Sequence, residues 1–172
     1  MKKLTYTTGN LLFNPRVEVV GHQANCQNTF GAGIARSIKE VYEEAYLIDT
    51  ISAAKKKNVL GSFSAARIPL VDGRLNRHGN KIHTIYNLYG QNLGTDHTKK
   101  LFRKTNYEAL YSALEAMAST LSEYDGDHPA PVVGFPFLMG CGLGGGNWNI
   151  VERLIEVAFE SYESDVIIVK FE

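Results

Sequence analysis

The sequence predicts an α/β fold in which a β-sheet lies between layers of helices. Two patterns alternate along the chain: short, continuous apolar runs such as 132–135 and 166–171, and longer segments with apolar residues at helical spacing, such as 105–121. A strand that is apolar on both sides must be covered on both faces of its sheet, which is typical of parallel sheets. The chain has 172 residues, so we expect one domain over residues 1–172.

The first half of the chain predicts four strands and one helix. Strands are expected at 4–8 and 17–21, on either side of a turn at Asn14-Pro15. A helix is expected from Gly33 to Leu47, because its apolar residues recur at helical spacing. The β-rich runs 62–70 and 81–89 flank a polar segment, which predicts a hairpin.

The second half predicts helices and strands in alternation. Thr105 and Glu108 have the spacing of a capping box, so a helix is expected to begin there and to continue to Leu121. After a loop rich in Asp, Gly and Pro come the strand 132–135, a glycine-rich loop, a helix that starts near Asn147 and a closing strand over 166–171.

Composition and charge exclude several classes of function. The 18 basic and 18 acidic side chains give a net charge of zero, so no nucleic-acid partner is expected. No apolar run could span a bilayer and the start does not resemble a signal peptide, which predicts a soluble, cytoplasmic monomer without a membrane partner. Cys26 and Cys141 lack the spacing of zinc ligands, and neither a metal nor a cofactor is expected.

The glycine-rich loop 140–146 is the most informative segment. Without Cβ atoms its backbone can approach a ligand closely and direct several N–H groups at an anion. The G-x-G-x-x-G spacing within it does not favour a dinucleotide fold, because Asp165 stands at the wrong end of the following strand. A Walker A loop is excluded, since Asn147-Trp148 follows the glycines. A phosphate-bearing ligand is the favoured interpretation, and an ordinary turn is the alternative.

A second loop, 21–33, lies between an expected strand and the first helix. Its amide side chains, including Gln23 and Asn25, can bond sugar hydroxyls, and Gly31 and Gly33 allow close approach at a helix start. Ligands of such folds bind at the carboxyl ends of strands, where both loops begin. Together the loops favour a sugar phosphate.

Four segments in this order resemble a macro domain: Gly9-Asn10, residues 22–35, residues 85–88, and residues 140–143 with Trp148. The resemblance covers most of the chain. It is nearest to the branch with the yeast-type ADP-ribose 1″-phosphate phosphatase and the terminal ADP-ribose protein glycohydrolase. It implies a three-layer sandwich with a mixed, mostly parallel sheet between helices, and ADP-ribose or ADP-ribose 1″-phosphate as the ligand.

The resemblance also implies which residues bind the ligand. The residues around Asn10 would flank the adenine, although Asn10 replaces the aspartate often found there. The two loops would enclose the diphosphate and the distal ribose, with Asn25 and Asn28 near the reacting end. The full expected set is Gly9, Asn10, Leu11, Gln23, Ala24, Asn25, Phe30, Gly31, Ala32, Gly33, Ile34, Gln91, Gly140, Cys141, Gly142, Leu143, Gly144, Gly145 and Gly146.

Two departures bear on the reaction. Glycohydrolases of the nearby branch resemble this chain but have a lysine and an aspartate where it has Gln91 and Gly144. Glutamine cannot form a covalent adduct as lysine does, and glycine offers no acid or base. The expected activity is therefore that of a phosphoric monoester hydrolase that converts ADP-ribose 1″-phosphate to ADP-ribose and phosphate. The alternatives are a hydrolase of ADP-ribosylated protein or O-acetyl-ADP-ribose, and a non-catalytic reader of ADP-ribose.

Four residues are candidates for catalysis. His22 is expected to be the general acid or base, because imidazole titrates near neutrality; a buried histidine bonded to a backbone carbonyl is the alternative. Asp96 and His97 form a second candidate pair, with a solvated loop as the alternative, and Asn28 is the fourth candidate. Cys141 is favoured as a small packing residue over a nucleophile.

Overall fold

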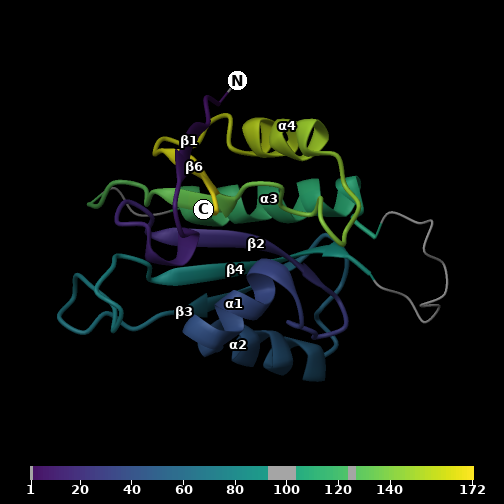
Figure 1. Cartoon of the computed structure of the whole chain (residues 1–172), viewed down its shortest axis with the longest axis horizontal. Helices are drawn as coiled ribbons and strands as arrows, with labels where there is room; N and C mark the ends of the chain where they lie inside the picture. The colour runs from purple at the N-terminus through teal and green to yellow at the C-terminus, as the bar shows by residue number, and fades with distance from the viewer. Residues whose placement is uncertain (1, 93–103, 124–126) are drawn as a thin grey trace.

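A six-stranded sheet forms the centre of the computed structural model, which describes residues 2–92, 104–123 and 127–172 (Figure 1). The strand order is β1-β6-β5-β2-β4-β3, in which β3 pairs antiparallel with β4 and the other neighbours pair in parallel. This confirms the expected mixed, mostly parallel sheet and the hairpin. The strands are β1 (Thr5–Thr8), β2 (Val19–Asn25), β3 (Phe63–Arg67), β4 (Thr84–Gln91), β5 (Val133–Pro136) and β6 (Val166–Lys170).

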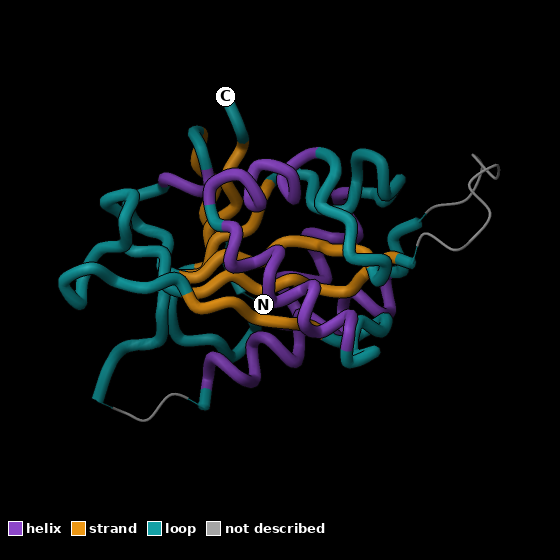
Figure 2. Tube along the Cα trace, turned by 90° about the horizontal axis from the view of Figure 1, so that it is seen from below, coloured by secondary structure: helices purple, strands orange, loops and turns teal. Residues whose placement is uncertain are grey.

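Helices cover both faces of the sheet, as expected of a three-layer sandwich (Figures 1 and 2). One face is covered by α1 (Gly33–Val41) and α2 (Glu43–Ala54), and the other by α3 (Tyr107–Ser122) and α4 (Trp148–Ala158). Each face has its own apolar core, because side chains alternate between the faces along a strand. Val20 and Ile85 pack under α1 and α2, whereas Val19 and Phe135 pack under α3 and α4. A short 3-10 helix, η1 (Leu11–Phe13), lies between β1 and β2.

Strand β2 is longer than the expected 17–21 and runs to Asn25. Parallel pairing with β4 continues the strand past Gly21, with His22 opposite Asn87 and Gln23 opposite Leu88. Polar side chains do not prevent this, because β4 supplies backbone partners along the whole of β2, whereas β5 pairs with it only at Val19 and Val20. Residues 22–25 therefore belong to the sheet and not to the loop after it.

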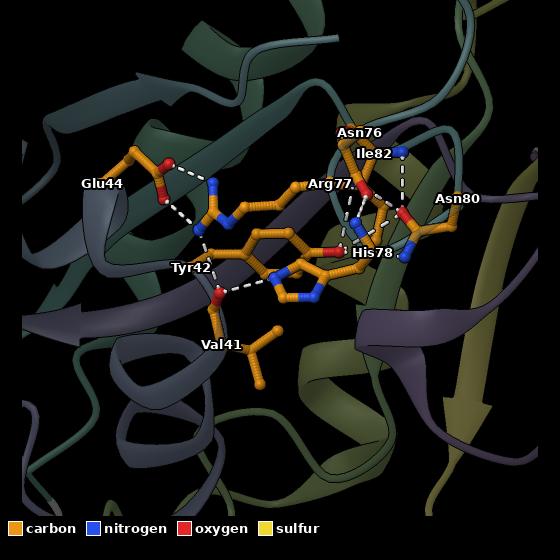
Figure 3. Close-up of polar contacts among 8 residues, drawn as sticks. All are labelled: Val41, Tyr42, Glu44, Asn76, Arg77, His78, Asn80 and Ile82. Carbon is orange, nitrogen blue, oxygen red and sulfur yellow. Dashed lines mark hydrogen bonds and ion pairs between the residues drawn. The ribbon is translucent and has the colours of Figure 1, made fainter. Parts of the chain in front are cut away.

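The single helix expected over 33–47 is two helices that meet at Tyr42, whose φ of −129° and ψ of 75° are not helical. The Tyr42 hydroxyl is buried, donates to the Leu12 carbonyl at 3.0 Å and accepts from Asn80 Nδ2 at 3.0 Å. Asn76 Nδ2 donates to Asn80 Oδ1 at 2.8 Å. These contacts hold the junction in place, and Figure 3 shows those among Tyr42, Asn76 and Asn80.

A second set of contacts fixes the same junction from the surface side (Figure 3). Arg77 forms an ion pair with Glu44 and donates to the Val41 carbonyl at 3.1 Å, and His78 Nε2 lies 3.0 Å from that carbonyl. The Arg77 bond lowers the pKa of the Glu44 carboxyl. We call the group Tyr42, Glu44, Asn76, Arg77, His78 and Asn80 the Tyr42 clasp. Because it fixes the end of α1, it also fixes the direction of that helix.

The expected capping box at Thr105 is wrong. The N-cap of α3 is Asn106, whose Oδ1 accepts from the Ala109 N–H at 3.0 Å. Asparagine caps at least as well as threonine, and the chain enters the helix one residue later. The Thr105 hydroxyl instead donates to the Gly140 carbonyl at 2.7 Å, which ties the start of α3 to the glycine-rich loop.

Cys26 and Cys141 are both free thiols. In the part of the chain that the structure describes, no helix combines the length and the apolar character that a membrane span requires.

Candidate ligand cavity

A cavity of about 520 Å³ opens at the carboxyl ends of β2, β4 and β5. This is the edge of the sheet at which α/β proteins place their ligands. Residues from both expected loops line it together, although more than 100 residues separate them in sequence. The lining residues are Gln23, Ala24, Asn25, Thr29, Gly31, Ala32, Gly33, Ile34, Ala35, Gln91, Lys104, Pro136, Phe137, Leu138, Met139, Gly140, Gly142, Leu143 and Gly144.

The glycine-rich loop is held in shape by its own backbone. The Gly145 N–H donates to the Gly142 carbonyl at 3.0 Å, and the Gly146 N–H donates to the Gly140 carbonyl at 2.9 Å. Gly140 and Gly145 have φ of +73° and +69°, a region that favours glycine. Within residues 2–92, 104–123 and 127–172, the amides at positions 142–144 donate to no backbone carbonyl. The loop therefore offers successive N–H groups to a ligand.

The N-terminus of α1 lines the same cavity. Its N-cap is Ala32, which makes no side-chain capping bond. The first N–H groups of a helix have no partner within the helix, so those of Gly33, Ile34 and Ala35 are available to a ligand. They carry the positive end of the helix dipole, which attracts anions. The cavity thus has backbone donors from two different elements.

A chain of side-chain hydrogen bonds forms one wall of the cavity. Gln23 Nε2 donates to Gln91 Oε1 and to Thr105 Oγ1, each at 2.8 Å. Thr105 in turn donates to the Gly140 carbonyl. The Gln23 Oε1 atom is buried and accepts no hydrogen bond from the described residues.

Polar residues at the end of β2 and just after it shape the loop before α1. Asn25 Nδ2 donates to Thr29 Oγ1 at 2.7 Å, and Asn25 Oδ1 accepts from the Gln27 N–H at 3.0 Å. Asn28 has φ of +57° and bonds through its side chain to Thr50 of α2, at 3.1 Å. Asn25 therefore reaches the cavity, whereas Asn28 does not line it and serves to anchor the loop to α2.

His22 does not line the cavity. Its ring is fully buried, lies edge-on to Phe30 at a centroid distance of 5.4 Å, and has its Nε2 atom 2.7 Å from Asn87 Oδ1. Burial lowers the pKa of His22 to about 4, against the opposing effect of the Asn87 bond. This placement speaks against proton transfer to a ligand. The structure matches the alternative interpretation of His22 as a buried histidine, except that its partner is the side-chain amide of Asn87 and not a backbone carbonyl. His22 is buried because β2 extends past Gly21 and includes it.

Seven residues of the expected ligand set lie outside the cavity lining. Asn10 Oδ1 accepts from the Leu12 N–H at 3.0 Å and so caps η1. Phe30 packs between His22 and Tyr46 in the core. The Cys141 thiol donates to the Met139 carbonyl at 3.3 Å, and burial raises its pKa, which suits a packing residue. The seven are Gly9, Asn10, Leu11, Phe30, Cys141, Gly145 and Gly146, and their contact with a ligand stays a prediction.

Sequence reasoning missed several lining residues. Lys104 reaches the cavity because its backbone N–H donates to the Gly144 carbonyl at 3.0 Å, and no periodic pattern marks that contact. Residues 136–139 form an apolar wall, and their position between a strand and the glycine loop was the available signal. Asp96 and His97 lie outside the described residues. Among the described residues, no cluster of His, Cys, Asp and Glu could hold a metal ion.

When the chain is compared with known proteins, only solved structures match it. No protein-family model and no curated protein matches the sequence. A protein of unknown function from Bacteroides thetaiotaomicron is 20% identical, with a TM-score of 0.78 over 98% of each chain. The macrodomain of Mycobacterium tuberculosis DarG is 22% identical, with a TM-score of 0.74 over 97% of each chain.

A further similar structure is Thermosipho africanus DarTG in complex with ADP-ribose, which is 19% identical with a TM-score of 0.72. The alignment covers 98% of this chain and 42% of that one. The macrodomain protein from Streptomyces coelicolor, at 18% identity and a TM-score of 0.70, is similar over 97% of this chain and 98% of its own. These alignments cover at least 97% of this chain, and the chain has the macrodomain fold.

Proposed function

We propose that the cavity binds ADP-ribose, with the diphosphate between the N-terminus of α1 and the glycine-rich loop. The observation that carries this proposal is that backbone donors of both elements, which donate to no carbonyl of the described residues, line one cavity. A diphosphate has oxygens on two sides and suits donors on two sides. Among the described lining residues none is acidic, and Lys104 adds a positive charge. The similar DarTG structure contains ADP-ribose, which supports the same ligand class here.

The adenosine end of the ligand would lie toward β1. The Gly9 N–H donates to the Lys170 carbonyl and the Phe137 N–H to the Val169 carbonyl, so both residues lie at the carboxyl end of β6. Phe137 lines the cavity, and its ring meets that of Tyr6 edge-on at 6.4 Å. A ligand that extends past Phe137 would therefore reach residues 9–11, which is where the resemblance to macro domains puts the adenine. The distal ribose would lie at the other side, near Asn25 and Gln91.

We infer further that the reaction is hydrolysis of ADP-ribose 1″-phosphate to ADP-ribose and phosphate. The backbone donors would hold the diphosphate and so fix the place of the 1″-phosphate at the distal end, and positioning supplies much of the catalysis. Gln91 stands in the cavity and cannot act as a covalent nucleophile. Asp96 and His97 remain the candidates for proton transfer, since the described lining contains no carboxylate, imidazole or thiol.

Binding without turnover is the second candidate function, and the same lack of acid–base side chains in the described lining favours it. Removal of ADP-ribose from protein or hydrolysis of O-acetyl-ADP-ribose is the hydrolytic alternative. The phosphatase and the non-catalytic reader share ADP-ribose as the ligand class, and they differ in whether a bond of the ligand is broken.

Two measurements on the same sample test the proposal. Calorimetry tests whether the protein binds ADP-ribose, and phosphate release from ADP-ribose 1″-phosphate tests whether it hydrolyses that ester. Release above that of a Gly144→Val variant supports the phosphatase. Tight binding without release favours the reader, and ADP-ribosylated protein is then the next substrate to offer. The absence of ADP-ribose binding would refute the proposed function.

A further inference from the structure

The side chain of Gln91 is oriented by a chain of hydrogen bonds that begins at the glycine-rich loop. The chain runs from the Gly140 carbonyl through the Thr105 hydroxyl and the Gln23 amide to Gln91. We call it the Gly140–Gln91 relay. Its first three members come from elements far apart in sequence and meet at the wall of the cavity, so the orientation of Gln91 depends on the tertiary fold.

The direction of each bond in the relay follows from counting protons. A carbonyl can only accept, so Thr105 uses its one hydroxyl proton on the Gly140 carbonyl at 2.7 Å. The bond between Thr105 Oγ1 and the Gln23 amide must then be donated by Gln23 Nε2. The second proton of Nε2 goes to Gln91 Oε1 at 2.8 Å. The Gln91 oxygen is thus occupied, and its NH₂ group is left for the cavity.

The reverse orientation of Gln23 is unfavourable. It would turn the two N–H groups of the amide toward Gly90 and Gly140, whose Cα atoms offer no acceptor. A Cβ built on Gly90 would lie 2.5 Å from Gln23 Oε1, so this oxygen sits against the glycine Cα–H groups, which are weak donors. An unpaired acceptor in that place costs less than two buried, unpaired donors.

We propose that Gln91 is a specificity-determining residue whose NH₂ group takes an oxygen acceptor at the distal-ribose end of the ligand. The inference rests on the proposed function, and it requires the distal-ribose end of the ligand to carry an oxygen that accepts a hydrogen bond. Gln91 is half-buried, lines the cavity and stands opposite Asn25 in the register of β2 and β4. Within the described residues the Gln91 oxygen accepts from Gln23, and the Gln91 NH₂ group donates to no atom. Phosphate oxygens, which carry charge and only accept, are the strongest partners for it. Gln23 and Thr105 are positioning residues that act through Gln91.

The first test follows the NH₂ resonances of Gln91 by NMR as ADP-ribose and, separately, ADP are added to the protein. The resonances are assigned by their absence from the spectrum of Gln91→Glu. We expect ADP-ribose to shift them and ADP, which lacks the distal ribose, to leave them in place, while backbone amides of residues 142–144 shift with both ligands. Shifts of the backbone amides without any shift of Gln91 would overturn the inference but keep the proposed function. If no resonance moves, the proposed function itself fails.

The second test compares affinities by calorimetry. Gln91→Glu keeps the acceptor for Gln23 and replaces the donor with a carboxylate, so we expect binding of ADP-ribose 1″-phosphate to weaken by roughly tenfold or more, as for a lost hydrogen bond to a charged group. Binding of ADP should weaken less, because its diphosphate lies farther from position 91 than the distal phosphate does. An equal loss of affinity for both ligands would show that the side chain at position 91 does not contact the distal end of the ligand.

The relay is tested by a matched pair of variants at Thr105. Thr105→Val removes the hydroxyl at nearly constant shape and frees Gln23 to reverse, whereas Thr105→Ser keeps the hydroxyl. We expect Thr105→Val to weaken ADP-ribose binding and to abolish the ligand-induced shift of the Gln91 resonances, and Thr105→Ser to restore both. A Thr105→Val protein that keeps the Gln91 shift would show that the relay does not orient Gln91.

Discussion

Gly144 occupies a place that has no room for a side chain. A Cβ on it would lie 2.4 Å from Thr105 Oγ1 and 2.6 Å from the Gly140 carbonyl oxygen, and two backbone N–H groups, of Lys104 and Thr105, donate to its own carbonyl. We therefore expect Gly144→Val to displace the loop and abolish ADP-ribose binding in calorimetry. Gly142→Ala is the comparison in the same loop: its Cβ would meet no protein atom within 4 Å, so a loss of affinity there would come from contact with the ligand and not from displacement of the loop. Unchanged affinity of Gly144→Val would refute this role of the loop.

His22 makes the stability of the fold depend on pH. Its pKa is lowered to about 4 in the folded protein, chiefly by burial, from 6.5 in the unfolded chain. The unfolded state therefore binds more protons between these values, so stability is complete above pH 6.5 and falls as the pH drops toward 4, by roughly 3 kcal/mol for this residue. Urea unfolding of the wild type and of His22→Gln at several pH values measures this. Parallel curves for the two proteins would contradict it, because their other titrating groups are the same.

Individual residues show where sequence reasoning reached the site and where it stopped. The glycines and amides of the cavity were identified because glycine runs and amide clusters at strand ends have few other uses. His22 was assigned to the cavity because strand β2 was ended too early, at Gly21. The partners of Thr105 and Lys104 lie about 35 to 40 residues away in the glycine loop, and local patterns carry no information on such contacts.

The junction of α1 and α2 depends on the Tyr42 clasp. Tyr42→Phe removes a buried hydroxyl that bonds to Leu12 and Asn80 and leaves their polar groups short of a partner. We expect it to lower the free energy of unfolding by about 1–3 kcal/mol. Glu44→Gln, which breaks the partly exposed ion pair with Arg77, should cost about 1 kcal/mol or less. Urea denaturation gives both values, and a larger loss for Glu44→Gln would reverse this ranking.

Strands and helices differed in how well the sequence predicted them. The apolar runs of β5 and β6 and the stripe of α3 were found because burial on both faces or on one helical face leaves a clear periodicity. The break at Tyr42 was missed, because the apolar spacing continues across it. Its cause is tertiary: the hydroxyl of Tyr42 finds its partners in residues 12, 76 and 80.

At the scale of the whole molecule, the two halves of the cavity belong to opposite layers of the sandwich. The N-terminus of α1 comes from one layer, and the glycine-rich loop leads into α4 in the other, so only the complete sheet brings them together (Figure 1). A ligand held between them binds the folded chain and not the unfolded one. Binding must therefore raise the stability of the whole fold.

ADP-ribose at about 100 times its dissociation constant should stabilise the protein by about 2.7 kcal/mol. For a chain of this length that corresponds to a rise in Tm of roughly 5 to 10 °C in a thermal scan. Because the layers are joined through one sheet, we expect a single transition that moves as a unit, with no second transition left behind. Gly144→Val should unfold without any ligand-dependent shift, since its loop cannot close on the diphosphate. A wild-type Tm that is indifferent to ADP-ribose at this concentration would exclude the bridging mode of binding, whereas a shift that persists in Gly144→Val would move the ligand away from the glycine-rich loop.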